Sequence, residues 1–163
     1  MNLNFINTLD LKSGGTVIIL CGPPGSGKST MANTIVDNFD NFKIIAPDKI
    51  REDITGDASS QSHNDVVFSK VYSLLVTYLC DGYNVVYDAT NCRSAYRHKI
   101  INVVKDYADY IICLMSTTPI SECIKRNEER NRHVPESVIE KMYFTLRKHP
   151  PVIFEGFDMI ASF

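Results

Sequence analysis

The sequence predicts an α/β fold in which helices cover both faces of a parallel β-sheet, giving three layers. The first observation is that segments with the apolar patterns of strands and of helices alternate along the chain. A strand, a helix and a further strand form a right-handed crossover, and this connection makes the two strands parallel. The second observation is a glycine-rich loop at 22–29 between the first expected strand and the first expected helix. With 163 residues, the chain has the length of one domain.

The first half of the chain alternates in this way. A strand at 16–21 is followed by a helix at 28–38, a strand at 42–46 and a short helical turn at 47–51. The next stretch is small and polar, which indicates a loop. A long helix at 64–80 then carries apolar residues at helical spacing, and it ends before Gly82, a typical C-cap residue.

The second half continues the alternation. We expect strands at 84–87 and 110–115, separated by a helix at 94–107. Two prolines suit the first turns of two further helices, which extend to about residues 130 and 149, and a last strand is expected at 159–163.

The loop at 22–29 fits the P-loop pattern G-x-x-x-x-G-K-[ST], with a strand before it and a helix after it. Its glycines let the backbone turn tightly and direct N–H groups at phosphate oxygens, above the positive end of the helix. Lys28 is expected to lie exposed at the loop mouth and to reach the β- and γ-phosphates, and the Ser29 hydroxyl is expected to hold Mg²⁺. The predicted cofactors are therefore ATP and Mg²⁺. The predicted nucleotide-binding residues are Gly22, Gly25, Ser26, Gly27, Lys28, Ser29 and Thr30.

Two acidic residues follow expected strands, at the edge of a parallel sheet where ligands bind. Asp48 follows the second strand and Asp88 the third. Either carboxylate could accept the proton of an attacking hydroxyl or hold Mg²⁺ through water, and either could instead cap a helix. Arg51 shares a helical face with Asp48 and could clamp an oxyanion of the acceptor, or pair with Glu52 or Asp53 at the surface.

The segment after the third expected strand offers further polar and basic groups. Thr90 and Asn91 are expected to provide hydrogen bonds at the rim of a substrate cleft. Arg93, Arg97 and Lys99 are a local positive charge that could contact acceptor phosphates. Arg97 and Lys99 fit a solvated helix face equally well.

Residues 125–133, KRNEERNRH, alternate in charge between two expected helices. Arg126 and Arg130 are spaced i, i+4 and are expected to point the same way. A helical hairpin with arginines is the usual lid of a small kinase, where it closes over the phosphates and neutralises charge that develops during transfer. The alternative is an exposed helix with Glu–Arg pairs, which contribute little to stability.

Composition agrees with a globular enzyme of the cytoplasm. Hydrophobic residues make up 44% of the chain, and neither a membrane-span-length apolar run nor a signal peptide is expected. The five cysteines show no C-x-x-C pair, so buried free thiols are expected. The formal net charge of −2 excludes bulk binding of nucleic acid and leaves only a local contact patch.

Together these motifs resemble the kinase domain of the 5′-polynucleotide kinase family, of the phage and viral type. The matching segments are GPPGSGKST, APDKIR, DATN, RNEERNRHVP with the following VIEKMY, and EGFD. The resemblance implies that Asp48 is the general base for the 5′-hydroxyl and that Arg51 engages the 3′-side phosphate of the acceptor nucleotide. It also implies that Arg126 and Arg130 bind the donor phosphates. Nothing in the chain resembles the phosphatase or ligase domains often fused to such kinases.

The sequence thus predicts a P-loop kinase domain over 1–163 that transfers the γ-phosphate of ATP to a 5′-hydroxyl end of DNA or RNA. The first alternative is a kinase for a small hydroxyl-bearing molecule, such as a nucleoside or a sugar. The second is a nucleotide-binding module without catalysis. The basic stretch at 93–99 and the family resemblance favour the polynucleotide over a small molecule, whereas the intact Lys28, Ser29 and Asp48 argue against a module without catalysis.

Overall fold

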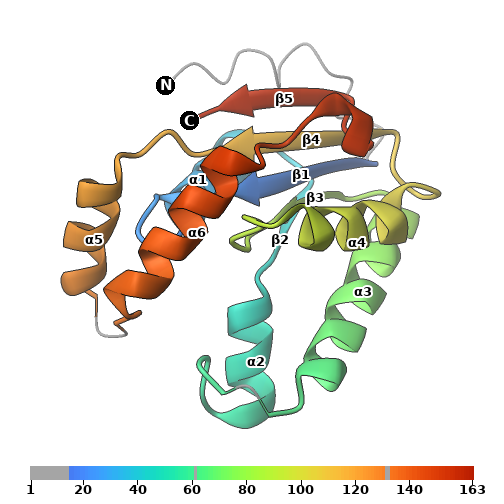
Figure 1. The fold of residues 1–163 in the computed structure, drawn as a ribbon. Coiled ribbons are helices and arrows are strands. Elements are labelled where there is room, and N and C mark those ends of the chain that lie inside the picture. The colour runs from blue at the N-terminus through green and yellow to red at the C-terminus, as the bar shows by residue number, and fades with distance from the viewer. Residues whose placement is uncertain (1–14, 61, 131–132) are drawn as a thin grey trace.

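The computed structural model describes residues 15–60, 62–130 and 133–163. Within them, parallel strands form one sheet in the order β2-β3-β1-β4-β5 (Figure 1). All pairings in this sheet are parallel, which confirms the predicted α/β fold. The strands are β1 (Thr16–Cys21), β2 (Phe42–Ile45), β3 (Asn84–Tyr87), β4 (Tyr110–Met115) and β5 (Met159–Ser162).

The helices follow the predicted alternation. They are α1 (Lys28–Asn38), α2 (Pro47–Thr55), α3 (Asn64–Cys80), α4 (Ser94–Val104), α5 (Ile120–Glu128) and α6 (Glu136–Lys148), and a 3-10 turn, η3, covers Ile153–Glu155. In the described part of the chain, no helix combines the length and the apolar character needed to cross a membrane.

Helix α2 extends beyond the predicted turn. Lys49 pairs with Glu52 at 3.0 Å and with Asp53 at 3.4 Å along its exposed side. The helix ends where Gly56 takes a left-handed φ of 75° and donates its N–H to the carbonyl of Glu52. Local ion pairs and this glycine cap therefore support the extra turn, and an apolar repeat could not have indicated it because Ile54 is exposed.

Strand β1 is the central strand of the sheet, and its residues belong alternately to two cores. Val17, Ile19 and Cys21 pack with residues of α3, α4 and α6 on one face of the sheet. Ile18 and Leu20 pack with residues of α1 on the other face. All of these β1 side chains are completely buried. The sheet therefore lies between two helical layers, as predicted.

The free thiols are also distributed as expected. Cys21, Cys92, Cys113 and Cys123 are buried, and Cys80 is exposed. Burial raises the pKa of Cys92 to about 12, so this thiol stays protonated and unreactive.

Candidate functional site

The P-loop joins β1 to α1 at the carboxyl edge of the sheet. Gly25 and Gly27 both adopt left-handed backbone conformations, with φ of 79° and 89°. A side chain on Gly25 would collide with the backbone carbonyl of Cys123, so this position requires glycine for conformation and for space. The N–H of Gly22 donates to the carbonyl of Thr90 at 2.9 Å, which ties the loop to the segment after β3.

Lys28 lies inside this loop rather than exposed at its mouth, so the expected exposure is wrong. Its side chain is 9% exposed, and Nζ donates to the carbonyl of Pro23 at 2.8 Å and to the hydroxyl of Ser26 at 3.4 Å. The loop folds over the lysine stem, and burial lowers the pKa of Lys28 while the charge of Asp88 acts to raise it. A desolvated ammonium in this position is suited to bind a phosphate oxygen.

Ser29 and Asp88 meet across the gap between α1 and the end of β3. The Ser29 hydroxyl donates to Oδ2 of Asp88 at 2.6 Å. Asp88 does not cap a helix, because the next helix, α4, begins later, after Arg93. Two oxygen ligands side by side suit Mg²⁺, which prefers oxygen and is usually held by one or two protein groups with the substrate phosphates. Among the described residues, no cluster of three or more His, Cys, Asp or Glu side chains could hold a metal ion.

A cleft of about 850 Å³ brings most of the predicted site residues together. Loops after three neighbouring strands contribute to it because the sheet order places β2, β3 and β1 side by side. The predicted residues that line it are Lys28, Ser29, Asp48, Arg51, Asp88, Thr90, Asn91, Lys99 and Arg130. This set combines the P-loop lysine with hydroxyl and carboxylate oxygens and two guanidinium groups, and such groups together suit phosphoryl transfer to a hydroxyl.

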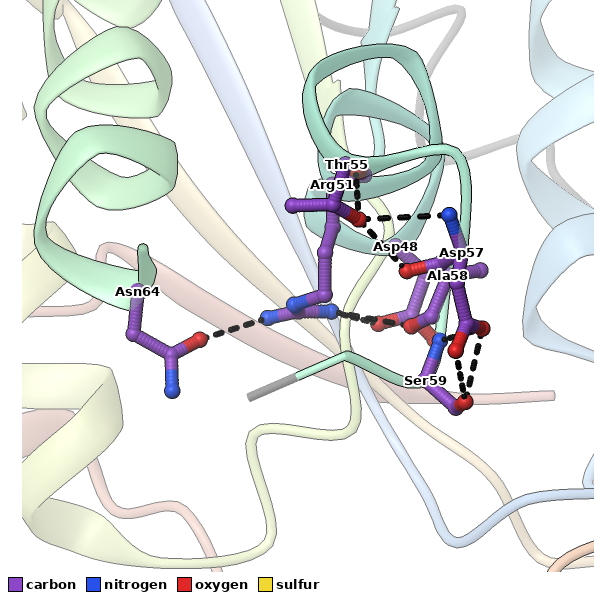
Figure 2. A network of polar contacts seen from close by, with 7 residues as sticks. All are labelled: Asp48, Arg51, Thr55, Asp57, Ala58, Ser59 and Asn64. Atoms are coloured by element: carbon purple, nitrogen blue, oxygen red, sulfur yellow. Dashed lines mark hydrogen bonds and ion pairs between the residues drawn. The ribbon is translucent and has the colours of Figure 1, made fainter. Parts of the chain in front are cut away.

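Asp48 and Arg51 form an ion pair within the first turns of α2 (Figure 2). Nη1 of Arg51 lies 2.5 Å from Oδ1 of Asp48 and also donates to the carbonyl of Ala58, while Nη2 donates to the amide oxygen of Asn64 on α3. The arginine side chain is 7% exposed, and that of Asp48 is 68% exposed. Arg51 therefore pairs with Asp48 rather than with Glu52 or Asp53, and it holds this carboxylate in place at the cleft.

Asp48 does not cap α2, because the cap position is Ala46 and Asp48 lies within the first turn.

Asn91 is placed differently from the prediction. It is 3% exposed and its amide nitrogen donates to the carbonyls of Leu20 and Ala89, so it braces the loop beneath the rim of the cleft. Arg93 is exposed over the ring of Tyr96, and it lines neither of the two hollows described in this subsection.

Both predictions for Arg97, contact with acceptor phosphates and a place on a solvated helix face, are wrong. The residue neither lines the cleft nor lies on a solvated face. The side chain is completely buried and makes two hydrogen bonds to Glu155, at 2.6 and 2.5 Å. It also donates to the backbone carbonyls of Asn91 and His149. Arg97 therefore joins α4, the loop after β3, the end of α6 and η3. The partner lies 58 residues away along the chain, and no local pattern could have indicated it.

The predicted lid arginines reach a second hollow of about 380 Å³ on the other side of the P-loop. Arg126 and Arg130 both line it with Gly27 and Thr30, and Arg130 alone of the two also lines the larger cleft. Helix α5 ends at Glu128, so Arg130 lies beyond its last turn. Arg126 pairs with Glu122 at 2.7 Å, so the expected Glu–Arg pairing exists alongside the hollow. Residues 131 and 132 of the predicted lid lie outside the described residues.

Some residues near the site were missed from the sequence. Asn127 is 5% exposed, and its amide exchanges two hydrogen bonds with the backbone of Val134, which closes the loop that carries Arg130. The cleft is also lined by the aromatic side chains of Phe68, Tyr72 and Tyr87. The i, i+4 spacing of Phe68 and Tyr72 was the available signal, but it could equally have meant packing in the core.

The chain is similar to known proteins that differ in their activities. The chain is 29% identical over 132 residues to the L-seryl-tRNA(Sec) kinase of Methanococcus maripaludis, a match covering 78% of this chain and 51% of that protein. It is similar to a chain of the Pnkp1/Rnl/Hen1 RNA repair complex, with 27% identity, a TM-score of 0.76, and coverage of 83% and 45%. The chain thus spans about half the length of these two relatives.

A gluconokinase from Sinorhizobium meliloti has the same fold, with 18% identity, a TM-score of 0.58, and coverage of 90% of this chain and 81% of that one. At this identity the likeness concerns the fold alone. The profile of a family described as AAA domain matches residues 17–149, which include the P-loop, the cleft and α6. The chain belongs to this AAA domain family, AAA_33, and its fold is that of a P-loop kinase.

Proposed function

We propose that this chain is an ATP- and Mg²⁺-dependent kinase that phosphorylates the 5′-hydroxyl end of a polynucleotide. The observation that carries this proposal is the single cleft that Lys28 and Ser29 share with Asp48 and Arg51. A phosphate held by the P-loop and a hydroxyl beside Asp48 would lie in one space. Two relatives named for RNA, the seryl-tRNA kinase and the chain of an RNA repair complex, support a nucleic-acid acceptor.

In the proposed reaction, the acceptor oxygen forms a bond to the γ-phosphorus as the bond between that phosphorus and the oxygen of the leaving ADP breaks. The hydroxyl proton passes to the carboxylate of Asp48, which Arg51 holds at 2.5 Å. Lys28 and the lid arginines would neutralise charge on the transferred group, and the adjacent oxygens of Ser29 and Asp88 would hold Mg²⁺. When bound, Mg²⁺ would supply neutralisation of the phosphate charge. Catalysis is then mainly positioning and electrostatics.

A second candidate is transfer to the serine hydroxyl of a seryl-tRNA. The 29% identity to a protein of that name favours it, and the same P-loop and carboxylate would serve. The two candidates share the donor side of the site and differ in the hydroxyl that lies beside Asp48.

The test is transfer from γ-labelled ATP with Mg²⁺ to a panel of acceptors: 5′-hydroxyl DNA and RNA oligonucleotides, seryl-tRNA, nucleosides and gluconate. We expect label on the 5′ end of the oligonucleotides. Asp48→Asn should lower kcat roughly 100-fold with ATP binding retained, because proton transfer by a positioned base contributes at least that factor. Asp53→Asn is the matched control, since Asp53 is an exposed acid on the same helix that pairs with Lys49. Label only on seryl-tRNA or gluconate would refute the proposal.

The lid arginines give a second prediction. Arg130 lines both hollows, and so it reaches the larger cleft that contains Lys28 and Asp48, whereas Arg126 lines only the smaller hollow. Arg130→Ala should therefore lower kcat by roughly 10- to 1,000-fold, with a smaller effect from Arg126→Ala and little change in ATP affinity in either case.

Steady-state kinetics and direct ATP binding for both variants check this order. Arg147→Ala is the control, since Arg147 is an exposed arginine of α6 that lines neither hollow. If Arg126→Ala reduced kcat more than Arg130→Ala did, or if neither changed it, the assignment of these arginines to the transfer step would be wrong.

A further inference from the structure

One wall of the large cleft is aromatic. Phe68 and Tyr72 lie one turn apart on α3, both line the cleft, and their ring centroids are 6.0 Å apart with an interplanar angle of 42°. Tyr87, the last residue of β3, lines the same cleft and is 2% exposed. The rings come from two elements that meet beside the proposed catalytic carboxylate, because α3 and β3 pack together.

Tyr87 belongs to the buried core, but Phe68 and Tyr72 are not simply part of it. The core-facing stripe of α3 is formed by Val67, Val71 and Leu75, which are completely buried. Phe68 and Tyr72 each lie one residue further along, on an adjacent stripe, and they remain half-buried at the cleft. Rings left partly exposed in a concave site gain free energy when a flat apolar face covers them.

Tyr87 adds a polar group to this wall. The residue lines the cleft although it is almost completely buried. Burial raises the pKa of Tyr87, so the phenol stays protonated and can donate a hydrogen bond at any working pH. Tyr72, Asp48 and Arg51 are close enough to Tyr87 to interact with it electrostatically. The wall therefore adjoins the ion pair at which the acceptor hydroxyl is proposed to lie.

We propose that Phe68, Tyr72 and Tyr87 form a subsite for the nucleobase of the acceptor's terminal nucleotide. This inference rests on the proposed function, since it places the base on the far side of the sugar whose 5′-hydroxyl lies beside Asp48. The cleft, at about 850 Å³, has the size that holds one compact organic ligand. A base offers a flat face to Phe68 and Tyr72 and polar edge atoms to the Tyr87 hydroxyl. A sugar alone would leave the rings largely uncovered.

The test uses two 5′-hydroxyl oligonucleotides that differ only at the 5′-terminal nucleotide, which carries a base in one and is abasic in the other. For the unmodified protein, the KM of the abasic acceptor should be roughly 5- to 150-fold higher, the range that corresponds to stacking of one base on an aromatic side chain. Phe68→Leu and Tyr72→Leu keep apolar bulk but remove the flat ring. They should raise the KM of the base-bearing acceptor and leave that of the abasic acceptor unchanged.

Tyr87→Phe removes only the hydroxyl and should raise the same KM by a smaller factor. Tyr78→Leu is the matched control: Tyr78 is a half-buried aromatic residue of α3 that meets Tyr83 edge to face and does not line the cleft. It should change neither KM.

The outcomes separate the two proposals. Equal KM values for the two acceptors with the unmodified protein would overturn the subsite and leave the proposed function standing, and this comparison requires no variant to fold. Equal increases for both acceptors in Phe68→Leu and Tyr72→Leu would likewise overturn the subsite, by showing a general structural effect. Failure to phosphorylate either oligonucleotide would refute the proposed function, and the subsite with it.

Discussion

Replacing Lys28 with methionine is expected to lower kcat for phosphoryl transfer roughly 100-fold or more, without lowering the stability of the protein. Removing a preorganised group that binds transition-state charge commonly costs this factor. Methionine fits the test better than alanine because Lys28 is 9% exposed, and a shorter side chain would leave a cavity inside the loop. The measurements are single-turnover transfer from labelled ATP and the thermal unfolding midpoint.

The stability half of this prediction follows from the burial of the ammonium group. Burial lowers the pKa of Lys28, which means that the protein environment disfavours the charged form. Removing that charge should leave the unfolding midpoint unchanged or higher. Lys105→Met, an exposed lysine just after α4, is the control and should change neither rate nor midpoint. If Lys28→Met kept more than about a tenth of the unmodified rate, the loop would not be the phosphate site of the reaction.

Arg97→Met is expected to lower the free energy of unfolding by roughly 3–5 kcal/mol, the cost of leaving a buried charge without its partner. Glu155 is 7% exposed at its side chain, so the carboxylate would have little water to replace the hydrogen bonds from the guanidinium. The carbonyls of Asn91 and His149 would lose donors as well. Urea unfolding of the variant measures the change.

Two further variants show whether the charge pair is the cause. Arg97→Met with Glu155→Leu should recover most of the loss, because replacing a whole buried ion pair by apolar residues is often neutral. Lys99→Met changes an exposed lysine of the same helix and should stay within about 0.5 kcal/mol. A loss below about 1 kcal/mol for Arg97→Met, or a double variant no more stable than the single one, would contradict this account.

Much of the fold could be predicted from the sequence because its signals are local. The bounds of β1, α1, α3, β3 and β4 agree with the predicted ranges. Each of these elements has a dense apolar pattern, and turn or cap residues mark their ends. The predicted ends of two helices were wrong. Helix α2 extends to Thr55 because local ion pairs and a glycine cap support an extra turn, and α4 ends at Val104 rather than at residue 107. The P-loop was equally predictable, since its function depends on residue types at fixed spacing.

The sequence by itself determined which chemical groups the chain has near each strand end: a P-loop, two acids, and arginines in the last turn of α5 and just after it. Only the tertiary structure decided which of them meet. The strand order brings Asp48 and Asp88 to the same cleft as Lys28, and packing turns Arg97 inward to Glu155 while Arg93 stays outside. The direction of a side chain on a helix is set by what packs against that helix, often from far along the chain. Charge and periodicity along the sequence therefore could not distinguish a buried, paired arginine from one available to substrate.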